Sequence, residues 1–317
     1  MCTSISMNKG GFCFGRNMDI EFHLGADVVL SPRRYAFHFK NGITGTLHHA
    51  ILGMAVVRDG VPLYADAVNE YGLCMAGLSF PDCVYAKQAD DGNTAIAPFE
   101  LIPWVLGSCR TLTEARALLR TTSIVDIPFN ASVPNTPLHW HIAHDELNES
   151  GALVVECTAD GLQLHDDPVG IMTNSPPLPF HLTNLKQYVH LSAQYPAVSH
   201  NESAPFGRGF GAIGLPGDFS PTSRFVRAAF LLQNSPIEQD ERRRTAQMLH
   251  ILGNVAMPLG SVYTADGRAE YTAYSCCISG TKYLYRTYFD NSLHEVDIRS
   301  CDNDSNELRI FPCHDAF

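Results

Sequence analysis

The sequence begins MCTSISMNKGGFCFGRNMD (residues 1–19), and this stretch decides the fold. Residues 2–7 and 12–18 predict two strands, because the turn composition Asn8-Lys9-Gly10-Gly11 favours a hairpin. Folding back at that turn places Cys2 roughly opposite Asn17. A local hairpin therefore brings residues 16–19 to the N-terminus. The strand predicted over residues 12–18 is thus expected to carry side chains that act on Cys2.

The spacing of Arg16 and Asp19 along the second predicted strand raises a question about where their side chains point. They are separated by an odd number of positions, so a regular strand sends their side chains to opposite faces. We expect both to reach Cys2 only if Gly15 marks a bulge or if one of them lies beyond the strand end. The sequence leaves these alternatives open.

Cysteine at position 2 predicts an enzyme whose N-terminus is its catalytic group. If Met1 is removed, Cys2 carries a free α-amino group beside its own thiol, and one residue supplies both base and nucleophile. An α-amino group has an ordinary pKa of about 7.7–8.0, so it is partly neutral at neutral pH and can accept a proton. The alternative is that Cys2 is a packed cysteine in a first strand, where cysteine behaves as a small hydrophobic residue.

Composition indicates a globular protein of 317 residues, which we interpret as a single domain over residues 1–317. Lysine and arginine number 22 against 33 acidic residues, a net charge of −11. This charge repels polyanions and anionic membrane surfaces, so we expect no nucleic-acid partner. No apolar stretch approaches the roughly 20 residues of a membrane helix, and residues 1–25 lack a secretory signal pattern. The sequence therefore predicts a cytoplasmic protein without membrane insertion.

The ten cysteines show no C-x-x-C pair and no regular spacing, which argues against a zinc site. Most of them are expected to be packed thiols in a reducing compartment. His139-Trp140-His141 places two imidazoles on one face of a strand, but no cysteine or carboxylate motif cooperates with them. We therefore expect no metal there.

Strands dominate both ends of the chain, and helices interrupt the middle. The alternation predicts strands at 62–68, 73–80, 140–144, 152–158, 162–165, 271–278, 282–289 and 293–298. Helices are predicted at 99–106, at 115–120 behind the capping box Thr111-Leu112-Thr113-Glu114, after Ser220-Pro221, and at 242–255. This order favours an α+β protein with two packed sheets flanked by helices over alternating βαβ units.

Several different short motifs follow one another along the chain. Gly15-Arg16-Asn17-Met18-Asp19 is followed by Asn69-Glu70-Tyr71-Gly72-Leu73, by Met172-Thr173-Asn174-Ser175-Pro176, and by Gly214-Leu215-Pro216-Gly217-Asp218 with Ser223-Arg224-Phe225. In these motifs, and in the Met-Cys start, the chain resembles the choloylglycine hydrolase family, which contains conjugated bile salt hydrolases and penicillin V acylases. The resemblance runs from Met1 to about Phe289.

The resemblance implies a four-layer αββα N-terminal-nucleophile hydrolase fold with two mainly antiparallel sheets. It also implies a homotetramer that cleaves a linear amide without metal or organic cofactor. In this family the cysteine matched by Cys2 attacks the carbonyl, and the aspartate matched by Asp19 orients the α-amino group. The arginines matched by Arg16 and Arg224 lie around the thiol and favour its charged form. The asparagine matched by Asn174 donates to the oxyanion.

One position departs from the family pattern. Bile salt hydrolases commonly have asparagine, and penicillin V acylases commonly tyrosine, where this chain has Ser79. The resemblance implies that the backbone N–H at this position is a second oxyanion donor, which serine can supply. Alternatively, Ser79 is an ordinary polar residue at a strand end. The departure affects the expected substrate more than the expected chemistry.

The resemblance favours glycine- or taurine-conjugated bile salts as substrates. Met18, Phe129 and Val133 match family positions that line an apolar trough for the steroid, and Ala65 is expected to join them. Cleavage would proceed through a thioester on Cys2, with exchange onto another amine as a side activity. Penicillin V acylase is the nearer alternative function. A non-enzymatic carrier of steroid-like ligands, with an inert Cys2, is the more distant one.

Overall fold

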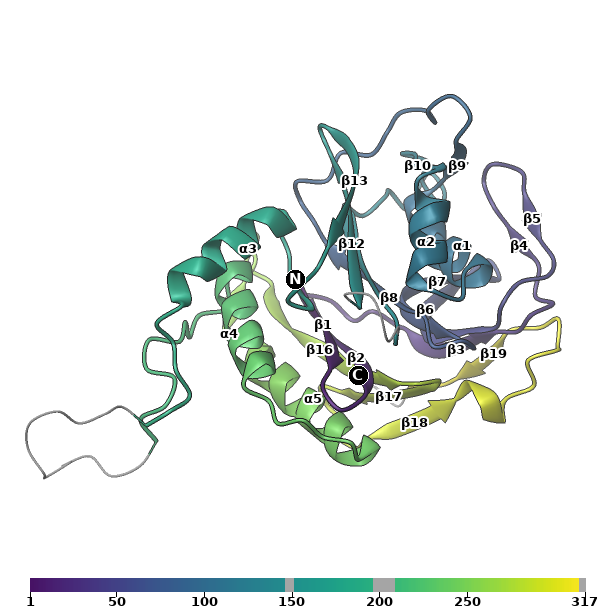
Figure 1. Ribbon diagram of the computed structural model, residues 1–317. Coiled ribbons are helices and arrows are strands. Elements are labelled where there is room, and N and C mark those ends of the chain that lie inside the picture. The colour runs from purple at the N-terminus through teal and green to yellow at the C-terminus, as the bar shows by residue number, and fades with distance from the viewer. Residues whose placement is uncertain (146–150, 196–208, 314–317) are drawn as a thin grey trace, which may run out of the picture.

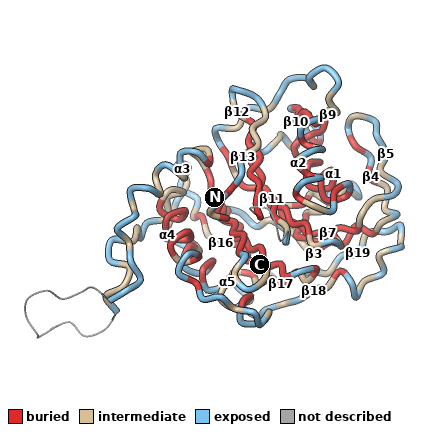
Figure 2. The backbone as a smooth tube through the Cα atoms, viewed as in Figure 1, coloured by how far each residue is buried: buried red, intermediate tan, exposed pale blue. Residues whose placement is uncertain are grey.

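The computed structural model describes residues 1–145, 151–195 and 209–313. Two large sheets lie face to face at its centre, and helices cover both outer surfaces (Figure 1). The two central layers hold most of the buried backbone, and the exposed residues gather on loops and outer helix faces (Figure 2). This arrangement confirms the predicted α+β class with four layers.

The first sheet contains the N-terminal strand and is seven-stranded, in the order β14-β1-β2-β16-β17-β18 with β15 paired to β16. All of its strand pairs are antiparallel. Its strands are β1 (Cys2–Asn8), β2 (Phe12–Ile20), β14 (Ile171–Met172), β15 (Val262–Tyr263), β16 (Ala269–Ser279), β17 (Lys282–Thr287) and β18 (His294–Asp297).

The second sheet is eight-stranded and also antiparallel throughout, in the order β13-β12-β11-β8-β7-β6-β3-β19. Its strands are β3 (Asp27–Ser31), β6 (Ile51–Arg58), β7 (Val61–Asn69), β8 (Cys74–Ser79), β11 (Leu138–Ala143), β12 (Ala152–Thr158), β13 (Gly161–Asp166) and β19 (Arg309–Phe311). Short pairs form elsewhere between β4 (Phe37–His38) and β5 (Thr44–Gly45), and between β9 (Thr94–Ile96) and β10 (Thr122–Ile124).

The helices form the two outer layers. On one side lie α3 (Leu178–Leu185), α4 (Pro221–Gln233) and α5 (Glu241–Val255), and on the other α1 (Leu101–Ser108) and α2 (Leu112–Leu119). The described part of the chain also contains three single-turn 3₁₀ helices: η1 (Pro98–Glu100), η2 (Lys186–Tyr188) and η3 (Ile298–Ser300). The predicted caps are confirmed, because Thr111 accepts from the Glu114 N–H and Ser220 accepts from the Ser223 N–H.

The second sheet divides its side chains between two cores. Val28, Leu30 and Leu52 point toward the first sheet, whereas the alternate residues Val29 and Ile51 point toward α1 and α2. Successive side chains of a strand point to opposite faces, so a strand that is covered on both faces contributes alternate residues to two cores. Cys2 and its neighbours belong to the first of these cores, which also extends to α4 and α5.

The N-terminal hairpin forms as the turn composition predicts, but its register is one residue from the expected one. Cys2 pairs with Met18, and Thr3 pairs with Asn17. The strand runs to Ile20, so Arg16 and Asp19 both lie within β2. Pairing with β1 is continuous through Gly15, so there is no bulge there. Neither of the two alternatives expected from parity is therefore correct.

Arg16 and Asp19 nevertheless both lie near Cys2 from a regular β2, because their side chains leave the strand on opposite faces of the sheet and Cys2 has neighbours on both faces. The Arg16 side chain points between the sheets, where it contacts the thiol and the second sheet. Asp19 lies toward Arg224 of α4 on the outer face. The irregularity falls instead in β16, where the register against β2 shifts between Thr272 and Tyr274.

Among the described residues, no helix is both long enough and apolar enough to cross a membrane.

Gly53 on β6 provides a test of how closely the second sheet is packed. A Cβ at this position would lie 2.1 Å from the Asp66 carbonyl oxygen and 2.5 Å from the Ala67 Cα on β7. We therefore expect Gly53→Ala to destabilise the protein by about 1–3 kcal/mol, the usual cost of overpacking. Urea denaturation would measure the loss. Gly217→Ala is the control, because no atom lies within 4 Å of a Cβ built there. Equal stability of both variants would contradict the packing described.

Candidate active site

The Cys2 thiol lies between the two sheets, at the edge of a cavity. The residue is 3% exposed. Its Sγ accepts a hydrogen bond from Arg16 Nη2 at 2.9 Å, and Met18 Sδ lies 3.7 Å away. Both neighbours come from β2, so the hairpin alone assembles this side of the site. The sulfur is therefore held against a cation while it faces the cavity.

Arg16 is fully buried and spans the gap between the sheets. Nη1 donates to the Ala65 carbonyl oxygen at 2.9 Å and to Asp66 Oδ2 at 3.2 Å, both on β7. Burial alone would lower the pKa of Arg16, but its electrostatic interactions with Tyr274, Cys2 and Asp66 together raise its pKa well above the ordinary value. The guanidinium therefore stays protonated beside the thiol.

The main chain of Cys2 faces away from β2, toward Asn174 and Arg224. The Cys2 N–H donates to Asn174 Oδ1 at 2.9 Å, and Arg224 Nη1 donates to the Cys2 carbonyl oxygen at 2.5 Å. Arg224 Nη2 also donates to Asn174 Oδ1 at 2.6 Å. Two donors on one atom establish it as the amide oxygen, so Asn174 Nδ2 is the group that faces Ser79. It donates to the Ser79 carbonyl oxygen at 2.8 Å.

The two arginines thus take different places around Cys2. Arg16 contacts the sulfur itself, whereas Arg224 contacts the main chain of the same residue and the hydroxyl of Thr3 at 2.6 Å. Burial lowers the pKa of Arg224, and Asp19 and Cys2 oppose that effect. The roles expected for these residues stay predictions.

Asp19 is fully buried beside Arg224, with 3.8 Å between Oδ2 and Arg224 Nη1. Thr272 donates its hydroxyl to Asp19 Oδ1 at 2.5 Å. Burial raises the pKa of Asp19, and Arg224 and the N-terminal ammonium partly offset that rise. Oδ2 has no hydrogen-bond partner among the described residues.

Met1 is present in this chain, so the nitrogen of Cys2 is an amide. The Met1 ammonium donates to the Asp19 carbonyl oxygen at 2.6 Å and forms an ion pair with Glu270. The Asp19 N–H donates in turn to the Met1 carbonyl oxygen at 2.9 Å. Met1 therefore extends β1 by one residue along β2, directly beside the thiol.

A cavity of about 550 Å³ opens at Cys2. Its wall contains all four residues predicted to line a substrate trough, together with three of the predicted catalytic residues: Met18, Ala65, Phe129, Val133, Cys2, Asp19 and Ser79. Apolar side chains provide most of the remaining wall, including Leu63, Phe99, Ile102, Leu138 and Trp140. Arg58 lies at the exposed end of this wall. The structure thus brings the predicted residues together, and their individual functions stay predictions.

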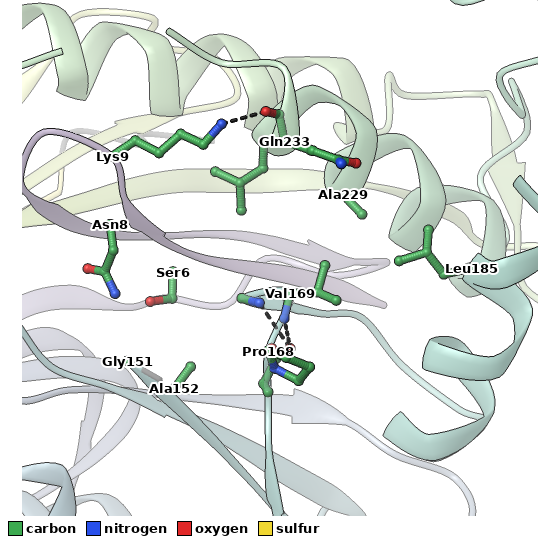
Figure 3. A pocket seen from close by; sticks show the side chains of 13 residues that line it. Ser6, Asn8, Lys9, Gly151, Ala152, Pro168, Val169, Leu185, Ala229 and Gln233 are labelled. Carbon is green, nitrogen blue, oxygen red and sulfur yellow. Dashed lines mark hydrogen bonds between the residues drawn. The ribbon is translucent and has the colours of Figure 1, made fainter. Parts of the chain in front are cut away.

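A second cavity, of about 620 Å³, lies near the hairpin turn, between β1 and α4 (Figure 3). Ser6, Asn8 and Lys9 line it together with Gln233 of α4, and Lys9 donates to the Gln233 carbonyl oxygen at 2.5 Å. Neither Cys2 nor Arg16 contributes to its described wall. Of these two cavities, the one at Cys2 contains the thiol.

His139 and His141 lie on one face of β11, as predicted, and both are fully buried. Each imidazole is bonded to protein groups. His139 contacts Glu156 Oε1 at 3.3 Å and the Thr173 carbonyl oxygen at 3.0 Å, and His141 Nδ1 contacts Ser4 Oγ at 2.7 Å. In residues 1–145, 151–195 and 209–313, no group of three or more His, Cys, Asp or Glu side chains is arranged to hold a metal ion.

Four site residues lay outside the sequence prediction: Thr3, Asp66, Glu270 and Thr272. Asp66 and Thr272 fall inside predicted strands, where one polar residue in an alternating pattern is expected to face solvent. Only the paired register of β2 and β16 shows that Thr272 lies opposite Asp19. A family alignment is the signal that could have identified these positions in advance.

Comparison with known proteins identifies the relatives of this chain. Residues 2–311 match the family described as linear amide C–N hydrolases, choloylglycine hydrolase family. A bile salt hydrolase/transferase from Lactiplantibacillus plantarum is 38% identical over 98% of this chain and 97% of its own length. Another, from Clostridium perfringens, is 37% identical over 98% and 96%.

Solved structures agree with the sequence comparison. A variant of the conjugated bile acid hydrolase from Clostridium perfringens superposes with a TM-score of 0.89 at 35% identity, covering 99% of this chain and 97% of that one. A penicillin V acylase from Agrobacterium tumefaciens gives a TM-score of 0.78 at 19% identity, covering 98% and 90%. At 19% identity, the similarity to the penicillin V acylase shows a shared fold.

The start of α4, which carries Arg224, provides a test of local electrostatics. Hydrogen bonds from Ser220 and Ser223 lower the pKa of Asp218 to about 2. A pKa below its unfolded value of about 3.9 stabilises the fold above that pH, and the contribution is lost as pH falls toward 2. We expect Asp218→Asn to lower Tm at neutral pH. The gap between variant and parent should narrow on acidification, and a gap that is the same at every pH would contradict this account.

Proposed function

Because the chain belongs to the choloylglycine hydrolase family and is therefore an amide C–N hydrolase, we propose that it hydrolyses glycine- or taurine-conjugated bile salts. One observation supports the proposal most strongly. Cys2 Sγ, hydrogen bonded to a buried guanidinium, opens on an apolar cavity of about 550 Å³. A steroid joined by an amide to a small acid requires an apolar site with a reactive polar end.

The nucleophile in this proposal is Cys2 after removal of Met1, within a single domain over residues 1–317. Cleaving the Met1–Cys2 bond converts an amide nitrogen into a free amine next to the thiol. This amine is a base that can accept the thiol proton. Asn174 Oδ1 already accepts from the same nitrogen, and Asp19 Oδ2, which accepts no hydrogen bond from the described residues, lies 3.8 Å from Arg224 Nη1. Both oxygens can orient the new amine.

The reaction then proceeds in two steps. The Cys2 thiolate attacks the amide carbonyl, and the α-ammonium returns its proton to the departing glycine or taurine, leaving a thioester. Water, activated by the freed amine, then cleaves the thioester and regenerates the thiol. Arg16 favours the charged sulfur because its guanidinium lies 2.9 Å from Sγ. Arg224 holds the main chain of the nucleophile.

Asn174 is proposed to stabilise the oxyanion. A side-chain amide has two N–H groups, and one of those on Nδ2 is occupied by the Ser79 carbonyl oxygen. The other can donate to the tetrahedral intermediate, with the Ser79 backbone N–H as a second donor. Removal of one such donor in other hydrolases costs about 10²–10³ in rate. Met18, Ala65, Phe129 and Val133 would contact the steroid.

A thioester also reacts with amines, so exchange of the amino acid is a proposed side activity. An amine that arrives before water would re-form an amide. The relatives from Lactiplantibacillus plantarum and Clostridium perfringens are both named hydrolase/transferase, which supports this extension. Incubating a conjugate with a second amino acid and finding no exchanged product would count against it.

Assembly as a homotetramer and a cytoplasmic location belong to the same proposal. The described parts of the chain between α3 and α4 extend away from the body of the molecule (Figure 1). They carry exposed apolar side chains, with Val189 85% and Ile213 63% exposed. Exposed apolar residues on a projecting segment are typical of an association surface.

Removing the nucleophile tests the chemistry. We expect Cys2→Ala to lower turnover by more than about 10³-fold, because no other group replaces the thiol, and to leave ligand binding measurable by calorimetry. Cys109→Ala is the control, because Cys109 is equally buried but packs in the other core. A Cys2→Ala protein with near-normal turnover would require a different nucleophile.

A substrate panel tests the proposed specificity. We expect release of glycine and taurine from glycocholate and taurocholate, and slower cleavage of penicillin V, because the cavity wall is long and apolar. Mass spectrometry of the released products measures each reaction. Preferential cleavage of penicillin V would instead identify an acylase of that type.

A further inference from the structure

A buried carboxylate, Asp66, lies behind Arg16 on the opposite sheet. Both side chains are fully buried, and Arg16 Nη1 donates to Asp66 Oδ2 at 3.2 Å. Asp66 is absent from the cavity wall, so it does not contact the substrate space. We propose that Asp66, with Tyr274 and Tyr283, is a positioning residue that holds the Arg16 guanidinium against the Cys2 thiol. The inference rests on the proposed function, in which Cys2 is the nucleophile.

A bulge in β7 aims two consecutive residues at Arg16. Met54 pairs with Asp66 but Ala55 pairs with Tyr64, so Ala65 is an extra residue in β7. The Ala65 carbonyl oxygen accepts from Arg16 Nη1 at 2.9 Å, beside the contact with Asp66. Bulges occur next to active sites because they redirect a side chain. Here the bulge supplies two acceptors to one end of the guanidinium.

The other end of the guanidinium meets the nucleophile. Arg16 Nη2 donates to Cys2 Sγ at 2.9 Å and lies 3.4 Å from Met18 Sδ. A guanidinium is planar and rigid, so fixing Nη1 also fixes where Nη2 points. The sulfur and the carboxylate are thus joined through one cation, and the position of that cation is determined from the far sheet.

The hydroxyl groups of Tyr274 and Tyr283 stabilise Asp66 as a carboxylate, because both donate hydrogen bonds to it. Tyr283 donates to Oδ1 at 2.5 Å, and Tyr274 donates to Oδ2. Burial, followed by the charge of Asp66, raises the pKa of both phenols well above the ordinary value, so their O–H groups persist. Cys276 Sγ also donates to Oδ1, at 3.5 Å, so with Arg16 four donors surround a group that, as a carboxylate, can only accept. The phenols also take part of its charge, which leaves the Arg16 cation less fully neutralised beside the thiol.

An asparagine at position 66 cannot satisfy this arrangement. It keeps the size of aspartate but places an NH₂ donor where Arg16 or a phenol already donates. Arg16 has no acceptor function and cannot lose its proton, so it must move if the NH₂ takes the Oδ2 position. If the NH₂ takes the Oδ1 position, the Tyr283 hydroxyl can turn to accept it, but Arg16 then meets a neutral amide oxygen in place of a carboxylate and is held less firmly. The alternative is that Asp66 is simply a negative charge near the thiol, whose removal would make the sulfur more readily ionised. The two readings predict opposite changes in thiol reactivity.

Alkylation of Cys2 by iodoacetamide at neutral pH distinguishes them and requires no bile salt. The N-terminal peptide is followed by mass spectrometry, which separates Cys2 from the other nine cysteines. We expect Asp66→Asn to slow alkylation by at least about fivefold, because only the thiolate reacts and the displaced cation no longer favours it. Alkylation at the parent rate or faster would overturn the proposal.

A double-variant cycle tests whether Asp66 acts through Arg16. We expect Arg16→Gln to slow alkylation as well, and the double variant to be no slower than Arg16→Gln alone, because the two substitutions remove one interaction. Multiplicative slowing would show an independent structural effect of Asp66 and would also overturn the proposal.

Tyr283→Phe keeps the experiment decisive if Asp66→Asn fails to fold. It removes one donor from Asp66, and we expect kcat for glycocholate to fall by about threefold or more with KM unchanged, because Tyr283 lies outside the cavity wall. Tyr285→Phe is the matched control on the same face of β17, because Tyr285 does not contact Asp66. Equal effects of the two variants on kcat, or a change confined to KM, would overturn the proposal. If no conjugate is cleaved by the parent, the alkylation rates of Tyr283→Phe and Tyr285→Phe give the same comparison.

Discussion

The hydrogen bond between Arg16 and the Cys2 sulfur is the interaction on which the site depends. Its two partners face each other because a tight turn folds β2 back on β1, and this requires only the first 20 residues of the chain. A guanidinium buried between two sheets is costly unless negative groups surround it. The first and second sheets supply those groups from opposite sides, so the same packing that closes the core also holds a cation against the Cys2 sulfur.

The space between the sheets is consequently a mixed interior. Val28 and Leu52 pack there alongside fully buried Arg16 and Asp66. The two fully buried arginines of the site each lie near a carboxylate, with 3.2 Å between Arg16 and Asp66 and 3.8 Å between Arg224 and Asp19 on the outer face of the first sheet. Removing one partner of such a pair leaves an uncompensated charge, which is why the site and the stability of the sandwich are coupled.

The pattern of residues within short segments correctly predicted the helices, strands and hairpin that depend on interactions between neighbouring residues. The N-terminal hairpin, the capped helices beginning after Thr111 and Ser220, and the strands of the C-terminal half all form close to their expected bounds. The strands β3 and β6 were not predicted, because a short apolar run such as residues 51–57 does not distinguish a buried strand from a helix. The family resemblance, confirmed by the match over residues 2–311, supplied Asn174 and Arg224.

The rest of the site depends on pairing between distant segments. Arg16 and Asp19 were expected to need either a bulge at Gly15 or a position beyond the strand end, whereas both lie within a regular β2 and their side chains leave it on opposite faces. Asp66 meets Tyr274 and Tyr283 across more than 200 positions, and no local pattern reveals that register. The central claim is that removal of one residue makes Cys2 the nucleophile. Mass spectrometry of enzyme quenched during turnover tests it most directly: we predict an N-terminal peptide that begins at Cys2 and carries the bile acyl group on its sulfur. An active enzyme that retains Met1, or an acyl group found on another residue, would contradict the account.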